Sequence, residues 1–186
     1  MSAQDLHDFW EAFELLQKGD YVLARSIFER LSLDDAKIQL AYMYQMGLGG
    51  SVDFEKSEEI YLDLMGKGRV DIAYDLAALY LRVDNTKNAL HYFEVSSSAG
   101  NPSASYWVSQ LYSGYKGGVE NEIFYLKYLA KAAEEGHLFA KRDLARLKYK
   151  SATSFFDFVK YRFQHIKTKL ICGLTVLKDV NDLRVR

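Results

Sequence analysis

Histidines and adjacent carboxylates are the residues in this sequence that could do chemistry at first sight. A zinc site needs three or four converging ligands, but the chain has one cysteine and its histidines are far apart, at His7, His91, His137 and His165. The pairs Glu58-Glu59 and Glu134-Glu135 point apart on a helix and suit solvated faces better than a shared acid-base site. No nucleophile, base and orienting acid share a recognisable spacing. We therefore expect no catalytic residue and no metal site, and we interpret the histidines as single surface residues.

A glycine-rich segment at residues 47–50 could be mistaken for a loop that binds phosphate. A dinucleotide-binding loop follows a strand and opens a helix, whereas here a helical pattern comes before the glycines. The glycines of this segment also recur one period of 68 residues later, at Gly117 and Gly118, as expected of a connection between repeated helices. We therefore expect no bound cofactor.

Composition indicates a protein of the cytoplasm. The only cysteine, Cys172, excludes an internal disulfide, which fits a reducing compartment. The N-terminal segment is acidic and amphipathic, unlike a secretory signal. The longest strongly apolar run, residues 170–177, is far shorter than the roughly 20 residues that span a bilayer.

Apolar residues recur at helical spacing through most of the chain, and the same helical pattern occurs in several copies. The first helix is expected over about residues 4–17, where apolar residues recur at helical spacing: Leu6, Phe9, Trp10, Phe13 and Leu16. Asp20 is placed to cap the second helix. Later copies carry a small residue at one shared position, which lets helices approach closely, at Ala41, Ala77, Ser109 and Ala145. Since one hairpin cannot bury its apolar face alone, we expect the hairpins to stack.

The pattern resembles the Sel-one-like repeat family, a relative of the tetratricopeptide repeats. The resemblance covers about residues 4–150 and is carried by Ala-x3-Leu-Ala-x2-Tyr, a glycine-rich loop, and Lys-Ala-Ala-Glu-Glu-Gly at residues 131–136. The fourth copy departs from the family at Tyr115, where a glycine is expected. The resemblance implies an all-α, right-handed α-solenoid of antiparallel helix hairpins that assembles complexes, usually without catalysis.

These patterns define an expected domain plan. Residues 1–150 form the repeat solenoid, and residues 151–186 form basic helices that cap or dock, the second of them ending near Leu183. The expected solenoid consists of hairpins at residues 4–32, 36–68, 69–100 and 101–136, followed by a half-repeat at residues 137–150.

The first helix of each hairpin is expected to line a concave groove that binds a segment of another protein. Aromatic residues and Arg dominate binding energetics, and they are frequent among the positions beside each core Leu: Phe9, Phe13, Ile38, Tyr42, Tyr74, Tyr106, Gln110, Arg142 and Arg146. The alternative is that these rings pack on adjacent helices.

The C-terminal segment has a strong charge bias. Residues 1–140 hold twelve Lys and Arg against twenty-one Asp and Glu, a net charge of −9, whereas residues 141–186 have a net charge of +8. We expect the stripe Phe155, Val159, Phe163, Ile166 and Leu170 to cover the last repeat, with Lys160, Gln164 and Thr168 opposite. The basic tail, including Lys160, Arg162, Lys167 and Lys169, would then also suit an acidic partner or anionic lipid.

Two functions follow from these patterns. The first is a non-catalytic adaptor that binds a protein or peptide segment. The alternative is a peripheral membrane tether that uses the basic C-terminal helix. Nucleic acid ranks below both, because most of the chain is acidic and no recognised motif is present.

Overall fold

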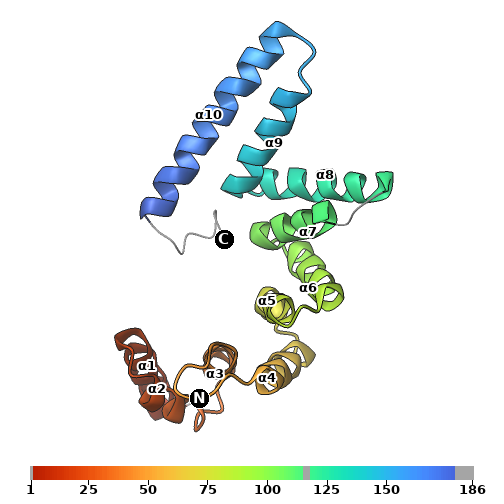
Figure 1. Ribbon diagram of the computed structural model, residues 1–186. Helices are drawn as coiled ribbons and strands as arrows, with labels where there is room; N and C mark the ends of the chain where they lie inside the picture. The colour runs from red at the N-terminus through yellow and green to blue at the C-terminus, as the bar shows by residue number, and fades with distance from the viewer. Residues whose placement is uncertain (1, 115–117, 179–186) are drawn as a thin grey trace. The chain divides into compact units, whose positions relative to one another are not determined.

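The computed structural model describes residues 2–114 and 118–178, and within these residues every regular element is helical (Figure 1). The chain divides into two compact units, residues 1–89 and 90–186. The predicted all-helical hairpin fold is therefore confirmed. We call the loop between the two helices of a hairpin its elbow. Tyr115 and Gly117, in the elbow of the fourth hairpin, lie outside the described residues, as does the predicted helix end near Leu183.

The first unit contains five complete α-helices and one 3-10 turn. They are α1 (Ala3–Lys18), α2 (Tyr21–Phe28), α3 (Asp34–Met46), α4 (Phe54–Gly66), the turn η1 (Val70–Ile72) and α5 (Ala73–Arg82). Helix α6 (Thr86–Ser98) begins in the first unit and ends in the second. The second unit continues with α7 (Pro102–Gly114), α8 (Val119–Glu134), α9 (Leu138–Lys150) and α10 (Phe155–Lys178).

Side-chain and glycine caps define several helix ends of the first unit. The Ser2 hydroxyl accepts a hydrogen bond from the Asp5 backbone N–H at 3.0 Å, which starts α1. Gly19 ends that helix with φ of 87°, and Asp20 caps α2 as predicted. The third elbow has no glycine, and Asp84 takes a positive φ of 56° there, a conformation that Asp tolerates better than most residues.

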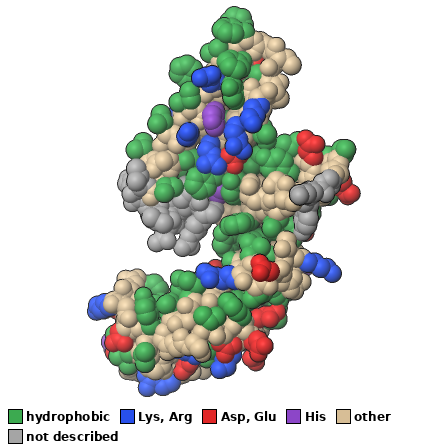
Figure 2. Space-filling model, in the orientation of Figure 1, with side chains coloured by type: hydrophobic (Ala, Val, Ile, Leu, Met, Phe, Trp, Pro, Cys, Tyr) green, Lys and Arg blue, Asp and Glu red, His purple; other side chains and the backbone are tan. Residues whose placement is uncertain are grey.

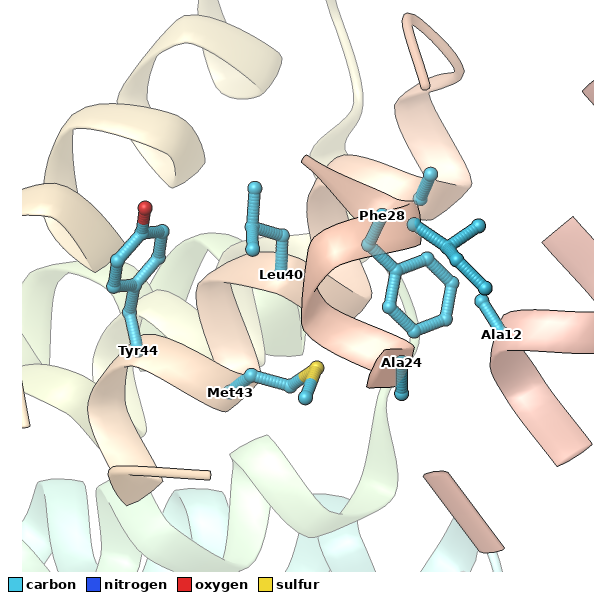
Figure 3. Packing of buried hydrophobic residues seen from close by; sticks show 8 residues of the cluster. Ala12, Ala24, Phe28, Leu40, Met43 and Tyr44 are labelled. Atoms are coloured by element: carbon cyan, nitrogen blue, oxygen red, sulfur yellow. The ribbon is translucent and has the colours of Figure 1, made fainter. Parts of the chain in front are cut away.

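The core of the first unit joins its first three helices. Phe28 of α2 is fully buried and lies between Ala12 of α1 and the α3 residues Leu40 and Met43 (Figure 3). The ring of Phe9 meets the Phe28 ring edge-on, with centroids 5.9 Å apart. The first hairpin thus buries its apolar face against the next hairpin, as the repeat pattern predicts.

The small residues at the repeated position are all buried. Ala41 and Ala77 in the first unit, and Ser109 and Ala145 in the second, expose at most 2% of their surface. A larger side chain at these positions would push the packed helices apart. The spacing in the sequence therefore correctly identified four positions that are buried where helices pack.

A repeated tyrosine joins three of the hairpins to the helix before them. Tyr44 of α3 donates a hydrogen bond to Glu29, at the end of α2, at 3.2 Å. Tyr80 of α5 donates to Glu58 of α4 at 2.5 Å. In the second unit the hydroxyl of Tyr112 of α7 donates to Glu94 of α6 at 3.2 Å. One tyrosine position therefore makes the same kind of link three times, each time to a glutamate: Glu29, Glu58 and Glu94.

We expect Tyr80→Phe to lower the free energy of unfolding by about 1–2 kcal/mol, because it removes a hydrogen bond to a charged group and leaves the ring in place. Denaturant unfolding followed by circular dichroism measures the loss. Tyr21→Phe is the control, since the Tyr21 side chain is exposed on α2 and the change should stay within about 0.5 kcal/mol. Equal effects of the two substitutions would show that the link adds no stability.

The motif at residues 131–136 supports a polar network between α6, α7 and α8. The Lys131 ammonium donates to the Ser97 carbonyl at 2.5 Å and to its hydroxyl at 2.9 Å. The hydroxyls of Ser97 and Ser105 are 2.8 Å apart, and Ser105 donates to Glu135 at 3.0 Å. Glu135 was expected to be merely solvated, but it is the acceptor at the end of this network.

Helix α10 packs along α9 as a terminal helix, but not through the predicted face. Phe155, Phe163 and Leu170 of the predicted stripe are exposed, so that part of the prediction is wrong. The physical reason lies in α9, whose Leu144 and Leu147 already pack on the core of α8, leaving little apolar surface for another helix. Within the described residues the tail forms one helix, Phe155–Lys178, and the end of the predicted second helix lies beyond them.

Candidate protein-binding surface

The nine predicted groove positions, called here the first-helix residues, all keep part of their side chain accessible. Five belong to the first unit: Phe9 and Phe13 on α1, Ile38 and Tyr42 on α3, and Tyr74 on α5. Four belong to the second unit: Tyr106 and Gln110 on α7, and Arg142 and Arg146 on α9. Tyr42 and Arg146 are exposed, and the other seven are half-buried.

The α1 rings pack mainly within their own hairpin. Phe9 and Phe13 stack with centroids 6.3 Å apart, and Phe9 also contacts the buried Phe28. Trp10 meets both rings edge-on, at 5.3 Å and 5.9 Å. Trp10 is 55% exposed, so the ring that this cluster presents to solvent is Trp10 and not the two predicted phenylalanines.

Tyr42 is the predicted aromatic residue of the first unit that is most available to a partner. It is 41% exposed, although the residues that precede and follow it, Ala41 and Met43, are fully buried. Ile38, one turn earlier on α3, is half-buried. Tyr42 therefore occupies a position where a ring reaches solvent from a rigid, well-packed helix, which is the arrangement that favours a binding contact.

Tyr106 of the second unit has a structural role in addition to its accessible edge. Its ring stacks on the His137 ring with centroids 4.4 Å apart, and its hydroxyl donates to Asp143 at 2.9 Å. Burial raises the pKa of Tyr106, and the neighbouring Asp143 carboxylate raises it further. Replacing Tyr106 would therefore disturb the packing of α7 on α9 as well as any contact with a partner.

The two arginines of α9 differ in how firmly they are held. The Arg142 guanidinium donates to Asp143 at 2.9 Å and lies 4.9 Å from the centre of the Phe139 ring. These contacts fix its orientation, and Asp143 thereby connects Arg142 to Tyr106. Arg146 is one turn later on the same helix and is exposed. Gln110 of α7 is half-buried, and its amide contacts the Ser109 hydroxyl at 3.4 Å.

His137 is a buried residue and not the surface histidine that we expected. It is fully buried, and its Nδ1 accepts a hydrogen bond from the Ala140 backbone N–H at 3.2 Å, which caps α9. His165 contacts the Arg142 carbonyl at 3.3 Å, whereas His7 and His91 are exposed as predicted. Among residues 2–114 and 118–178, no three His, Cys, Asp or Glu side chains are placed to hold a metal ion.

Two residues of these surfaces were not among the predicted site residues. Asp143 orients both Tyr106 and Arg142, and the signal for it was its position as the only acidic residue in the basic segment 141–150. Trp10 was assigned to the packed stripe of α1 because its spacing fits helical periodicity. Its residue type was the better signal, since Trp is enriched where binding energy is concentrated.

The predicted basic tail residues Lys160, Arg162, Lys167 and Lys169 are all exposed on α10. Cys172 of the same helix is buried, and burial raises the pKa of its thiol, which makes it a poor nucleophile. In the part of the chain that the structure describes, no helix combines the length and apolar character needed to cross a membrane.

The stacked hairpins define an all-helical repeat protein, and comparisons agree on that class. No family model matches the sequence. No curated protein matches it either. A crystal structure of a Sel1 repeat protein from Oxalobacter formigenes is similar with a TM-score of 0.67 and 16% identity, over 86% of this chain and 69% of that chain.

A second solved structure shares the fold. It is c5321, a protective antigen present in uropathogenic Escherichia coli strains that displays an SLR fold. The TM-score is 0.64 at 16% identity, over 96% of this chain and 42% of that chain. This protein therefore has the fold of the Sel1-like repeat proteins, as the resemblance in its sequence implied.

Proposed function

We propose that this protein is a non-catalytic scaffold that binds a segment of another protein through its first-helix residues. The observation that carries the proposal is the contrast along each first helix. The core positions, such as Leu76 and Val108, are fully buried, whereas every first-helix residue keeps an accessible part. Repeat folds of this kind bind other proteins in general, which agrees with this arrangement.

The chemistry of the accessible residues indicates the kind of segment. Tyr42 supplies a ring for apolar contact in the first unit. In the second unit Arg142 supplies positive charge beside the Phe139 ring, which lies next to Tyr106, and Arg146 is a second, exposed cation on the same helix. A guanidinium pairs well with a carboxylate, often through two hydrogen bonds. We therefore expect a segment bound at the second unit to carry Asp or Glu, and a segment bound at the first unit to carry an apolar or aromatic residue.

The test compares two double variants with the wild-type protein in capture from the native cell lysate, followed by direct titration of the captured protein. Tyr42→Ser with Arg146→Ser changes two first-helix residues. Tyr21→Ser with Lys141→Ser is the control, because Tyr21 is exposed to a similar extent, at 39%, and Lys141 is an exposed cation of α9. Loss of one aromatic and one Arg contact should weaken binding by at least tenfold.

All four substituted side chains are exposed, so melting temperatures should stay close to that of the wild-type protein. The proposal requires that the control retains the partner and that the Tyr42/Arg146 variant loses it. Equal retention by both variants would mean that the partner binds elsewhere. A scaffold that acts through the first-helix residues is excluded if every protein retained by the wild type is also retained by the folded Tyr42/Arg146 variant.

A further inference from the structure

Helix α10 has two opposite faces, and the one that packs mixes polar side chains with aromatic ones. Its contacts with α9 are made by residues that alternate at spacings of three and four. Phe158 packs on Tyr149 with ring centroids 5.0 Å apart, and His165 contacts the Arg142 carbonyl. The side chains that are buried or half-buried at this spacing are Phe158, Tyr161, His165, Thr168, Cys172 and Thr175.

The opposite face of α10 is apolar and exposed. At about 100° per residue, one side of the helix collects six large apolar side chains within roughly a quarter to a third of its circumference. Their exposed fractions run from 38% at Val159 to 75% at Phe155. We call this set the outer stripe: Phe155, Val159, Phe163, Ile166, Leu170 and Leu174. A contiguous apolar surface of this kind marks an interaction site.

Positive charge borders the outer stripe on both sides. By the same helical geometry Lys160 and Lys167 follow one edge, and Arg162 and Lys169 follow the other. None of these four cations forms a salt bridge with a carboxylate that the structure describes. The only acidic residue of α10, Asp157, is half-buried on the side that faces α9. Figure 2 shows hydrophobic side chains along the outer edge of α10, with Lys and Arg gathered beside them.

This distribution of charge argues against a second copy of the chain as the partner that covers the outer stripe. Helices that pair with each other usually carry acids and bases along the edges of their apolar seam, so that the edges attract. Two outer stripes placed together would bring Lys and Arg against Lys and Arg in either orientation, which is repulsive. A surface that offers negative charge on both sides of an apolar layer avoids that repulsion.

We propose that α10 lies flat on an anionic lipid surface, with the outer stripe inserted between the headgroups and its cations paired with lipid phosphates and carboxylates. An interfacial helix has this composition, an apolar face bordered by Lys and Arg. Anionic lipids attract cations that lie near the membrane surface. The helix is held along α9 by the face opposite the outer stripe, so it can present the stripe without leaving the fold. This proposal does not depend on the first-helix residues.

The experiment is sedimentation of the full chain with vesicles of phosphatidylcholine containing phosphatidylserine, and with vesicles of phosphatidylcholine alone. Phe163→Glu with Leu170→Glu places charge in the outer stripe. Phe163→Gln with Leu170→Gln removes the apolar side chains without adding charge and serves if the first variant fails to fold. Val22→Glu with Val119→Glu is the matched control, because both valines are exposed on other helices.

We expect the wild-type protein and the control to sediment with the anionic vesicles and both outer-stripe variants to lose at least about tenfold in partitioning. Changing Lys160, Arg162, Lys167 and Lys169 to Gln should weaken partitioning by about fivefold for each cation and remove its dependence on salt.

Four results would overturn the proposal. One is a wild-type protein that stays in solution with anionic vesicles at low salt. Another is equal partitioning of the folded outer-stripe variants and the control. The third is a wild-type dimer in analytical ultracentrifugation that dissociates in the Phe163/Leu170 variants and does not sediment with lipid, which would assign the stripe to a second copy of the chain. Capture of an acidic protein by the stripe, again without sedimentation with lipid, would likewise assign it to a protein partner.

Discussion

Phe28→Ala is expected to lower the free energy of unfolding by about 3–5 kcal/mol, the largest effect of any single substitution considered for this protein. The Phe28 ring is fully buried where α1, α2 and α3 meet, and it contacts Phe9 edge-on. Removing it leaves a cavity that Ala12 and Ala24, which are small and equally buried, are unable to fill. Denaturant unfolding of the two proteins, followed by circular dichroism, gives the difference.

The matched control for this prediction is Phe156→Ala. It makes the same chemical change at a residue of α10 that is 84% exposed, so its effect should stay within about 0.5 kcal/mol. If Phe28→Ala costs no more than Phe156→Ala, the first two hairpins are not joined through the core described above.

Gly49→Ala is expected to cost at least about 2 kcal/mol, because two penalties combine at this position. Gly49 has φ of 74°, and the left-handed conformation costs a residue with a side chain about 1–2 kcal/mol. A methyl group there would also overlap the Tyr21 carbonyl oxygen and approach its carbon to 2.8 Å. Both are backbone atoms in the first turn of α2, so relief of the overlap requires movement of that helix.

Gly68→Ala separates the two penalties. Gly68 has φ of 87°, but no atom lies within 4 Å of the place where its methyl group would be. Its substitution should therefore cost only the conformational term, about 1 kcal/mol. The same unfolding measurement decides between them: equal losses for Gly49→Ala and Gly68→Ala would show that the elbow is not packed on α2.

The glycines at residues 47–50 resemble a phosphate-binding loop but have a structural role. Gly47 ends α3 with φ of 67°, and Gly49 lets the loop lie against α2. A side chain at Gly50 would meet the Arg25 guanidinium, which lies over the Tyr44 ring at 4.2 Å. The glycines are required by contact between neighbouring hairpins, which agrees with the interpretation of this segment as a connection.

The repeat positions were predictable because they obey local rules. Helical periodicity identified the buried Leu40 and Leu76, and the small residues Ala41 and Ala77 were expected where helices approach. Asp20 and Gly19 were recognisable as a cap and a break from residue type alone. The resemblance to the Sel-one-like repeats then implied how the hairpins are arranged, and solved structures share that fold.

The surfaces were less predictable, because periodicity does not distinguish the two apolar sides of a helix. Trp10 and Leu6 fit the spacing of a buried stripe, yet both are exposed. On α10 the same reasoning chose the wrong face, since it assumed that the preceding repeat still had apolar surface to cover. In each case the face that is buried depended on which surface of a neighbouring helix was still uncovered.

The sequence by itself determined the secondary structure, the hairpin repeat and the positions of close helix packing, because each depends on residues within a few turns of one another. Only the tertiary structure decided the partners: that Glu29 and Glu58 accept the tyrosine hydrogen bonds, that Asp143 connects Tyr106 to Arg142, and that α10 faces α9 with the side opposite its outer stripe. These contacts join residues up to 37 positions apart, and their energies depend on which surfaces remain once the neighbouring hairpins have packed.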